Sequence, residues 1–138
     1  MRYPLKSILK IFAKTFALFF VFDFFWLTKV SPGFYRAHIG HLLADDPNLW
    51  AALAFYVIFI AGLTWFAVLP SAVNYRFSRA FGRGAFFGLV TYATFDLTCQ
   101  AVLKDWPMIV TIVDLIWGVT LTGLTTAISA RKVGRLRP

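Results

Sequence analysis

Three aspartates interrupt stretches of this chain that are otherwise apolar and uncharged: Asp23, Asp96 and Asp114. An ionisable side chain inside a segment long enough to cross a bilayer is costly, so it is normally kept where it faces a cavity, a partner or a substrate path. Any function of the chain is therefore expected to involve these three carboxyl groups.

The composition indicates that the surrounding solvent is a bilayer. Hydrophobic residues make up 59% of the chain and charged residues only 14%, which is too little charge for the surface of a soluble domain of this size. The formal charge of +8 collects at the ends of the apolar stretches, where basic residues set topology and bind anionic lipids. We therefore expect membrane lipids as partners, and no nucleic acid.

Four apolar stretches are long enough to span a bilayer: residues 11–30, 49–69, 84–103 and 107–130. Ser31-Pro32-Gly33 is expected to break the first helix, Pro70 to stop the second, and Pro107 to begin the fourth. The short turn at residues 104–106 must join the last two spans as an antiparallel hairpin. The sequence thus predicts an all-α membrane protein with four transmembrane helices in a single integral membrane domain, residues 1–138.

The distribution of basic residues predicts the orientation. All but three of the 14 Lys and Arg residues lie in the N-terminal arm, in the loop of residues 71–83 or in the tail; the exceptions are Lys29, Arg36 and Lys104. Basic residues accumulate on the cytoplasmic side of membrane proteins. We expect a multi-pass protein of a bacterial inner membrane with both termini in the cytoplasm.

The first outer loop carries a helical pattern of its own. Over residues 32–44, Ser31 and Pro32 provide a start signal, and apolar residues recur at near-helical spacing, which predicts a short amphipathic helix. Its histidines, His38 and His41, have a spacing suited to metal. Two histidines in an interfacial helix are more often solvated, so we expect no metal site and keep these two as the alternative.

The three aspartates share one depth. Asp23 lies seven residues before Val30, Asp96 eight before Lys104, and Asp114 seven after Pro107. At helical rise each carboxyl group lies about 10–12 Å below the outer surface. Helices running in different directions thus bring carboxyl groups to one layer, which predicts a shared ligand-binding or proton-binding site.

Helical neighbours extend this predicted site to Tyr92, Thr111 and Trp117, which share faces with Asp96 and Asp114. Several carboxyl groups in a dry layer cannot all ionise, so at least one should be protonated near neutral pH. A shared proton, a bound cation, or hydrogen bonds that only hold helices together would each satisfy them. Glycines on the third and fourth spans should let the two backbones approach closely: Gly84, Gly88, Gly118 and Gly123.

Three segments resemble an uncharacterised family of small bacterial inner-membrane proteins of unknown function: GAFFGLVTYATFDLT at 84–98, LKDWP at 103–107 and TIVDLIWG at 111–118. The similarity covers residues 16–130 and departs from the family pattern at Phe95 and Cys99, where Tyr and Asn are more common. The resemblance implies four spans and supplies no activity.

Three functions are compatible with these features. The first is binding or transport of a proton, a cation or a small solute at the aspartates, in a homo-oligomer. The second is an accessory subunit whose aspartates bind a partner membrane subunit. The third is an intramembrane lipid-modifying enzyme with Asp96 and Asp114 as an acid–base pair. Short loops favour the first two, the sequence identifies no cofactor, and whether the protein is an enzyme stays open.

Overall fold

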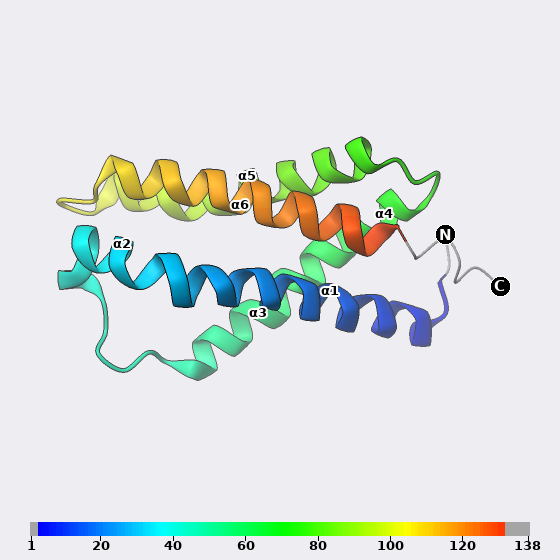
Figure 1. The fold of residues 1–138 in the computed structure, drawn as a ribbon, viewed down its shortest axis with the longest axis horizontal. Coiled ribbons are helices and arrows are strands. Elements are labelled where there is room, and N and C mark those ends of the chain that lie inside the picture. Colours follow the sequence, from blue (N-terminus) through cyan, green and yellow to red (C-terminus); the bar gives the residue numbers. More distant parts are fainter. Residues whose placement is uncertain (1–2, 132–138) are drawn as a thin grey trace.

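The computed structural model of the chain describes residues 3–131, and every regular element within them is helical (Figure 1). The first helical run consists of α1 (Leu5–Phe25), a π-helical turn η1 (Trp26–Val30), α2 (Ser31–Ile39) and a 3₁₀ turn η2 (Gly40–Leu42). The second run consists of α3 (Leu49–Leu63), a second π-helical turn η3 (Thr64–Val68) and α4 (Leu69–Ala72). The remaining helices are α5 (Phe77–Val102) and α6 (Met108–Ala130).

α5 and α6 form an antiparallel hairpin with the most extensive contact in the molecule, as the short connection predicts. Figure 1 shows α1 and α2 lying along this hairpin, with the start of α1 and the end of α6 at the same end of the bundle. That placement is compatible with two termini on one side of a membrane. Four basic residues used in predicting the orientation lie outside the described residues: Arg2, Lys132, Arg135 and Arg137.

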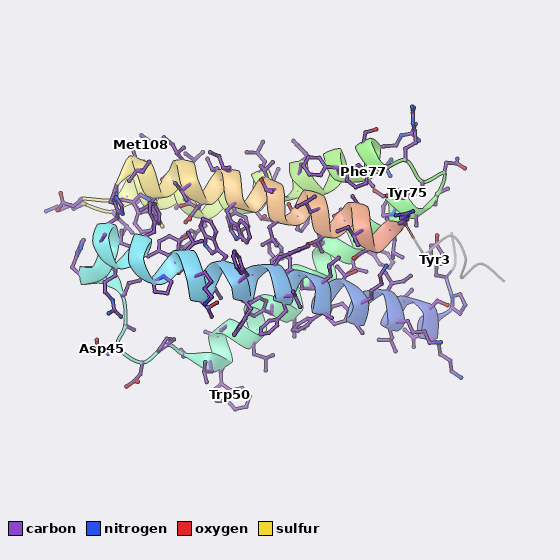
Figure 2. All side chains as sticks on the ribbon, in the orientation of Figure 1. Tyr3, Asp45, Trp50, Tyr75, Phe77 and Met108 are labelled. Carbon is purple, nitrogen blue, oxygen red and sulfur yellow. The ribbon has the colours of Figure 1, made fainter. Side chains whose placement is uncertain are left out.

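α3 joins the bundle only through its second half. It begins at Asn48, whose side-chain oxygen accepts the backbone N–H of Ala51 at 3.1 Å, as expected of a helix cap. Its first turn leans away from the other helices, and Trp50 projects outward there (Figure 2). Near its end, Ile60 and Leu63 are fully buried against the core. The first half of α3 therefore leaves α5 partly uncovered.

The outer surface of the bundle is strongly apolar. Large side chains such as Ile58, Phe86 and Ile116 are more than 60% exposed, which a soluble protein rarely tolerates over a wide surface. Within residues 3–131, two helical runs are long and apolar enough to cross a membrane, Leu49–Ala72 and Met108–Ala130. α1 and α5 contain more charged and polar residues, and neither is among these two runs.

The prediction that Ser31-Pro32-Gly33 breaks the first helix was wrong: α2 follows η1 directly, and Val30 at its N-cap position is itself helical. The chain stays helical because the π-helical turn η1 widens the backbone just before Pro32, which lacks an N–H and would clash in an ordinary helix. The helix predicted for residues 32–44 therefore continues α1 rather than standing alone. Its Ile39 packs on Trp106 and Val110 at the turn of the hairpin.

Three other boundaries also differ from prediction. Pro70 does not end the second run, which continues to Ala72 because η3 precedes this proline just as η1 precedes Pro32. α5 begins at Phe77 rather than at Gly84, and α6 begins at Met108, directly after Pro107. These changes lengthen the helices without moving the aspartates off them.

Candidate functional site: a buried carboxyl layer

The α5–α6 hairpin is packed backbone against backbone at its glycines. A Cβ atom added to Gly88 would lie 2.3 Å from the carbonyl oxygen of Gly118 and 2.1 Å from the Thr122 hydroxyl oxygen. A Cβ atom at Gly84 would meet the Thr122 carbonyl oxygen at 2.3 Å. The predicted close approach at the glycines is thus confirmed, and it brings the aspartates of α5 and α6 together.

Asp96 of α5 and Asp114 of α6 are adjoining buried carboxyl groups. Asp96 is completely buried and Asp114 is 8% exposed, and Asp114 is the charged neighbour that acts on Asp96. Among the described residues, no group other than the Asp114 carboxyl lies within hydrogen-bonding reach of either oxygen of Asp96. Two ionised carboxylates contain no donor between them, so a proton or a cation is needed to satisfy the pair.

Asp114 receives one donor from the outer end of the first helical run. The Tyr35 hydroxyl of α2 donates a hydrogen bond to Asp114 Oδ1, and Trp26 of η1 lies beside the same hydroxyl. Tyr35 lies beyond Val30, the last residue of the predicted span. Burial, together with the Asp114 carboxylate, raises the pKa of Tyr35 above its ordinary value, so Tyr35 keeps the proton that it donates.

Asp23 of α1 has its own set of donors. The Tyr56 hydroxyl of α3 donates to Asp23 Oδ2 at 2.5 Å, and the indole N–H of Trp117 on α6 donates to Oδ1 at 3.5 Å. Asp23 is 8% exposed. Three helices therefore meet at this carboxylate, and both of its oxygens are hydrogen-bonded.

Two aromatic residues of the predicted site connect the two carboxyl clusters. Tyr92 lies over Gly118, where an added Cβ would come within 2.3 Å of its ring. The Tyr92 hydroxyl is also close enough to Asp23 and Asp114 to interact electrostatically with both carboxyl groups. Trp117 stacks on Trp26 with ring centroids 4.4 Å apart and an interplanar angle of 11°. The structure thus gathers five of the six predicted residues: Asp23, Asp96, Asp114, Tyr92 and Trp117.

The sixth predicted residue, Thr111, belongs to a separate network. Its hydroxyl donates to Gln100 Oε1 and accepts from the Trp106 indole N–H, each at 3.1 Å. Gln100 in turn donates to the Trp106 backbone carbonyl at 3.1 Å. These bonds close the α5–α6 turn and do not reach the carboxyl groups, so Thr111 has a structural role here.

A cavity of about 340 Å³ opens beside Asp96 and Asp114. It lies between α3 and the uncovered part of α5, and its other lining residues are Phe55, Phe59, Thr91, Tyr92 and Phe95. No basic side chain is among the residues that line it. An acidic, aromatic-walled cavity of this kind suits a proton or a positively charged group.

The two histidines of the outer loop lie outside this layer. The Nδ1 atom of His38 is 2.8 Å from the Phe34 carbonyl oxygen, and His41 is exposed in η2. Among the residues that the structure describes, no group of three or more His, Cys, Asp or Glu side chains is arranged to hold a metal ion.

Sequence reasoning missed both phenols that donate to the aspartates, Tyr35 and Tyr56. Tyr56 was accessible by the depth argument, because it lies seven residues into α3 from Leu49 and so at the depth of the carboxyl layer. Tyr35 was not, because an outer loop that breaks away at residue 31 would not carry it back over α6. Only the uninterrupted run through η1 does so.

The comparisons with known proteins give one result. Neither the curated proteins nor the solved structures compared with the chain include a significant match. A family model described as "Predicted membrane protein (DUF2177)" matches residues 8–131, which is most of the chain. The chain therefore belongs to the DUF2177 family of predicted membrane proteins.

Proposed function

We propose that the protein binds a proton in exchange for a cation or a small positively charged solute at Asp96 and Asp114, as part of a transport role. The observation that carries the proposal is the state of Asp96, which is completely buried and has only a second carboxyl group, that of Asp114, within hydrogen-bonding reach. A group retained only to hold helices together would be expected to have partners, as Asp23 does. An unsatisfied intramembrane carboxyl group is therefore better explained by a ligand.

The same observation argues against the accessory-subunit alternative. A carboxyl group that binds a helix of another protein has to be presented on the outer surface of the bundle. Asp23, Asp96 and Asp114 are all less than 9% exposed. The lipid-modifying enzyme is less favoured because the cavity presents only carboxyl, phenol and threonine groups beside its phenylalanines, and none of its lining residues is basic.

We further propose that α1 and α5 span the membrane together with the two more apolar runs, with both termini in the cytoplasm of a bacterial inner membrane. The bundle supports four spans because α1 and α5 run alongside α6 over most of its length (Figure 1).

Single cysteines at Asp45 and Ser78, both exposed positions, test the orientation in a Cys99→Ser background. Asp45→Cys should react with an impermeant thiol reagent from outside the cell, and Ser78→Cys should react only after the membrane is opened. Reaction of Ser78→Cys from outside would overturn the orientation.

Proton exchange tests the binding site directly. The full-length protein in lipid nanodiscs is placed in weakly buffered solution at about pH 7, and potassium, sodium and alkylammonium chlorides are added while a pH dye reports proton release. Binding of a cation should release protons. The ionisable groups near Asp96 are Asp114 of α6 and Tyr35 of α2, with Tyr92 and Cys99 on α5 itself.

Matched variants assign the released proton. Asp96→Asn should abolish the release, whereas Asp105→Asn makes the same chemical change in the exposed turn between α5 and α6 and should leave it intact. Asp105 has a positive φ of 59°, which asparagine tolerates. Failure of every cation to release protons, or equal release from Asp96→Asn, would overturn the proposal.

A further inference from the structure

The cavity beside Asp96 is lined by aromatic as well as acidic side chains. Phe55 and Phe59 of α3 and Thr91, Tyr92 and Phe95 of α5 line it together with Asp96 and Asp114. Aromatic faces attract cations that have shed part of their water, and organic ammonium ions are the ligands that such surroundings favour. The lining thus combines a net negative charge with four aromatic rings.

The geometry disfavours a bare metal ion in this cavity. Hard cations in proteins are held by six or more oxygen atoms, and transition metals need at least three closely placed ligands. The cavity offers two carboxyl groups, one threonine hydroxyl and one phenol hydroxyl, and no group of three His, Cys, Asp or Glu side chains that could hold a metal occurs among the described residues. Its volume of about 340 Å³ lies at the lower end of the range for small organic ligands.

The cavity opens sideways through an apolar rim. Phe55 is 45% exposed and Phe95 is 59% exposed, and they stand on either side of the gap left by the first half of α3. No charged residue lines the cavity apart from the two aspartates. A ligand entering between α3 and α5 from the membrane must therefore carry hydrocarbon groups around its charge.

We propose that the ligand is a small organic ammonium ion with apolar substituents, which enters between α3 and α5 and places its charge against Asp96 and Asp114. The proposal rests on the proposed function, because it names the class of cation that exchanges with the proton. The aromatic wall supplies affinity for the substituents, and the carboxyl pair supplies the counter-charge.

The preference for an ammonium ion with apolar substituents is tested by measuring the binding of tetrapropylammonium. Tryptophan fluorescence of the full-length protein in nanodiscs reports binding, since Trp26 and Trp117 lie beside the carboxyl layer. Tetrapropylammonium should bind at least about tenfold more tightly than potassium or tetramethylammonium, and Asp96→Asn should weaken it about tenfold or more.

A pair of phenylalanines on α5 provides the matched control. Phe95→Ala removes a ring from the rim and should weaken tetrapropylammonium binding about fivefold. Phe86→Ala removes an equally exposed ring, 67% against 59%, from a position outside this cavity, and should leave that binding unchanged. Binding of potassium and tetrapropylammonium with equal affinity, or an unchanged affinity in Phe95→Ala, would overturn this inference and leave the proposed function standing. Absence of proton release with every cation would remove both.

Discussion

Asp23 and Asp96 are both buried aspartates of long helices, yet only Asp23 has hydrogen-bond donors on its carboxyl group. Asp23 is approached by Tyr56 and Trp117, so its two oxygens are satisfied by the protein itself. Asp96 is approached instead by a second acid, Asp114. The first arrangement stabilises the contact between helices, and the second leaves a charge that only a proton or a ligand can balance.

The two positions also depend on different helix pairs. Asp23 is held between α1, α3 and α6, whereas Asp96 and Asp114 come from the two arms of a single hairpin. α5 and α6 approach so closely at Gly88 and Gly118 that no side chain fits between their backbones. A carboxyl group with donors, Asp23, can thus lie near one without donors, Asp96. The closely packed helices α5 and α6 hold Asp96 against Asp114 although no donor satisfies it.

The largest expected effect follows from separating the hairpin. Gly88→Val places a branched side chain where even a Cβ would lie 2.1 Å from the Thr122 hydroxyl oxygen, so it should destabilise the fold by about 3 kcal/mol. Gly82→Val is the control, because nothing lies within 4 Å of a Cβ there, and both substitutions add a branched residue to α5. Thermal unfolding in nanodiscs measures the difference. Equal melting temperatures for the two variants would show that the close approach is not needed to hold Asp96 against Asp114.

The next prediction concerns leucine substitutions of the two aspartates, which should change the free energy of unfolding in opposite directions. Asp23→Leu leaves the Tyr56 hydroxyl and the Trp117 indole without an acceptor and should destabilise the protein by about 1–3 kcal/mol. Asp96→Leu removes a buried group whose one neighbour within hydrogen-bonding reach is a second acid, and the adjacent cavity can take the larger side chain, so stability should rise by about 1–2 kcal/mol.

Thermal unfolding and proton release are measured on both variants. Asp96→Leu should unfold at a higher temperature than the natural chain and release no protons when cations are added. A loss of stability in Asp96→Leu as large as that in Asp23→Leu would mean that Asp96 has a structural partner, and it would end the contrast between the two sites.

Much of this arrangement could be predicted from the sequence because it depends on spacing along single helices. The distances of Asp23, Asp96 and Asp114 from the nearest loops gave their common depth, and the short connection after Leu103 required the hairpin. Glycine spacing indicated the close approach of α5 and α6, which the structure confirms.

The remainder depends on how helices rotate and continue, which spacing does not determine. Pro32 and Pro70 were expected to end helices, but a π-helical turn precedes each and lets the helix proceed. Tyr35 is carried to Asp114 only by that continuation. Thr111 shares a helix face with Asp114 in sequence, yet Gln100 and Trp106 satisfy its hydroxyl. Hydrogen-bond partners from other elements are thus the part that one sequence leaves undetermined.

The smallest expected effect is the difference in stability between the phenylalanine variants of the two phenol donors. Tyr35→Phe removes the phenol that donates to Asp114 and should cost about 2 kcal/mol of stability, since bonds to charged groups are the stronger class. Tyr56→Phe should cost about 1 kcal/mol, because Asp23 keeps the indole N–H of Trp117 at 3.5 Å.

The two variants delete the same hydroxyl group and keep the ring, so thermal unfolding compares them without a change in packing. Proton release on cation binding is a second measurement that compares the two variants. Tyr35→Phe leaves the Asp96–Asp114 pair without its phenol donor, so the pair should hold its shared proton more tightly and release less of it at a given cation concentration. Tyr56→Phe acts on Asp23 and should leave the release close to that of the natural chain. If Tyr56→Phe changed proton release as much as Tyr35→Phe did, the two carboxyl clusters would have to act as one site connected through Tyr92.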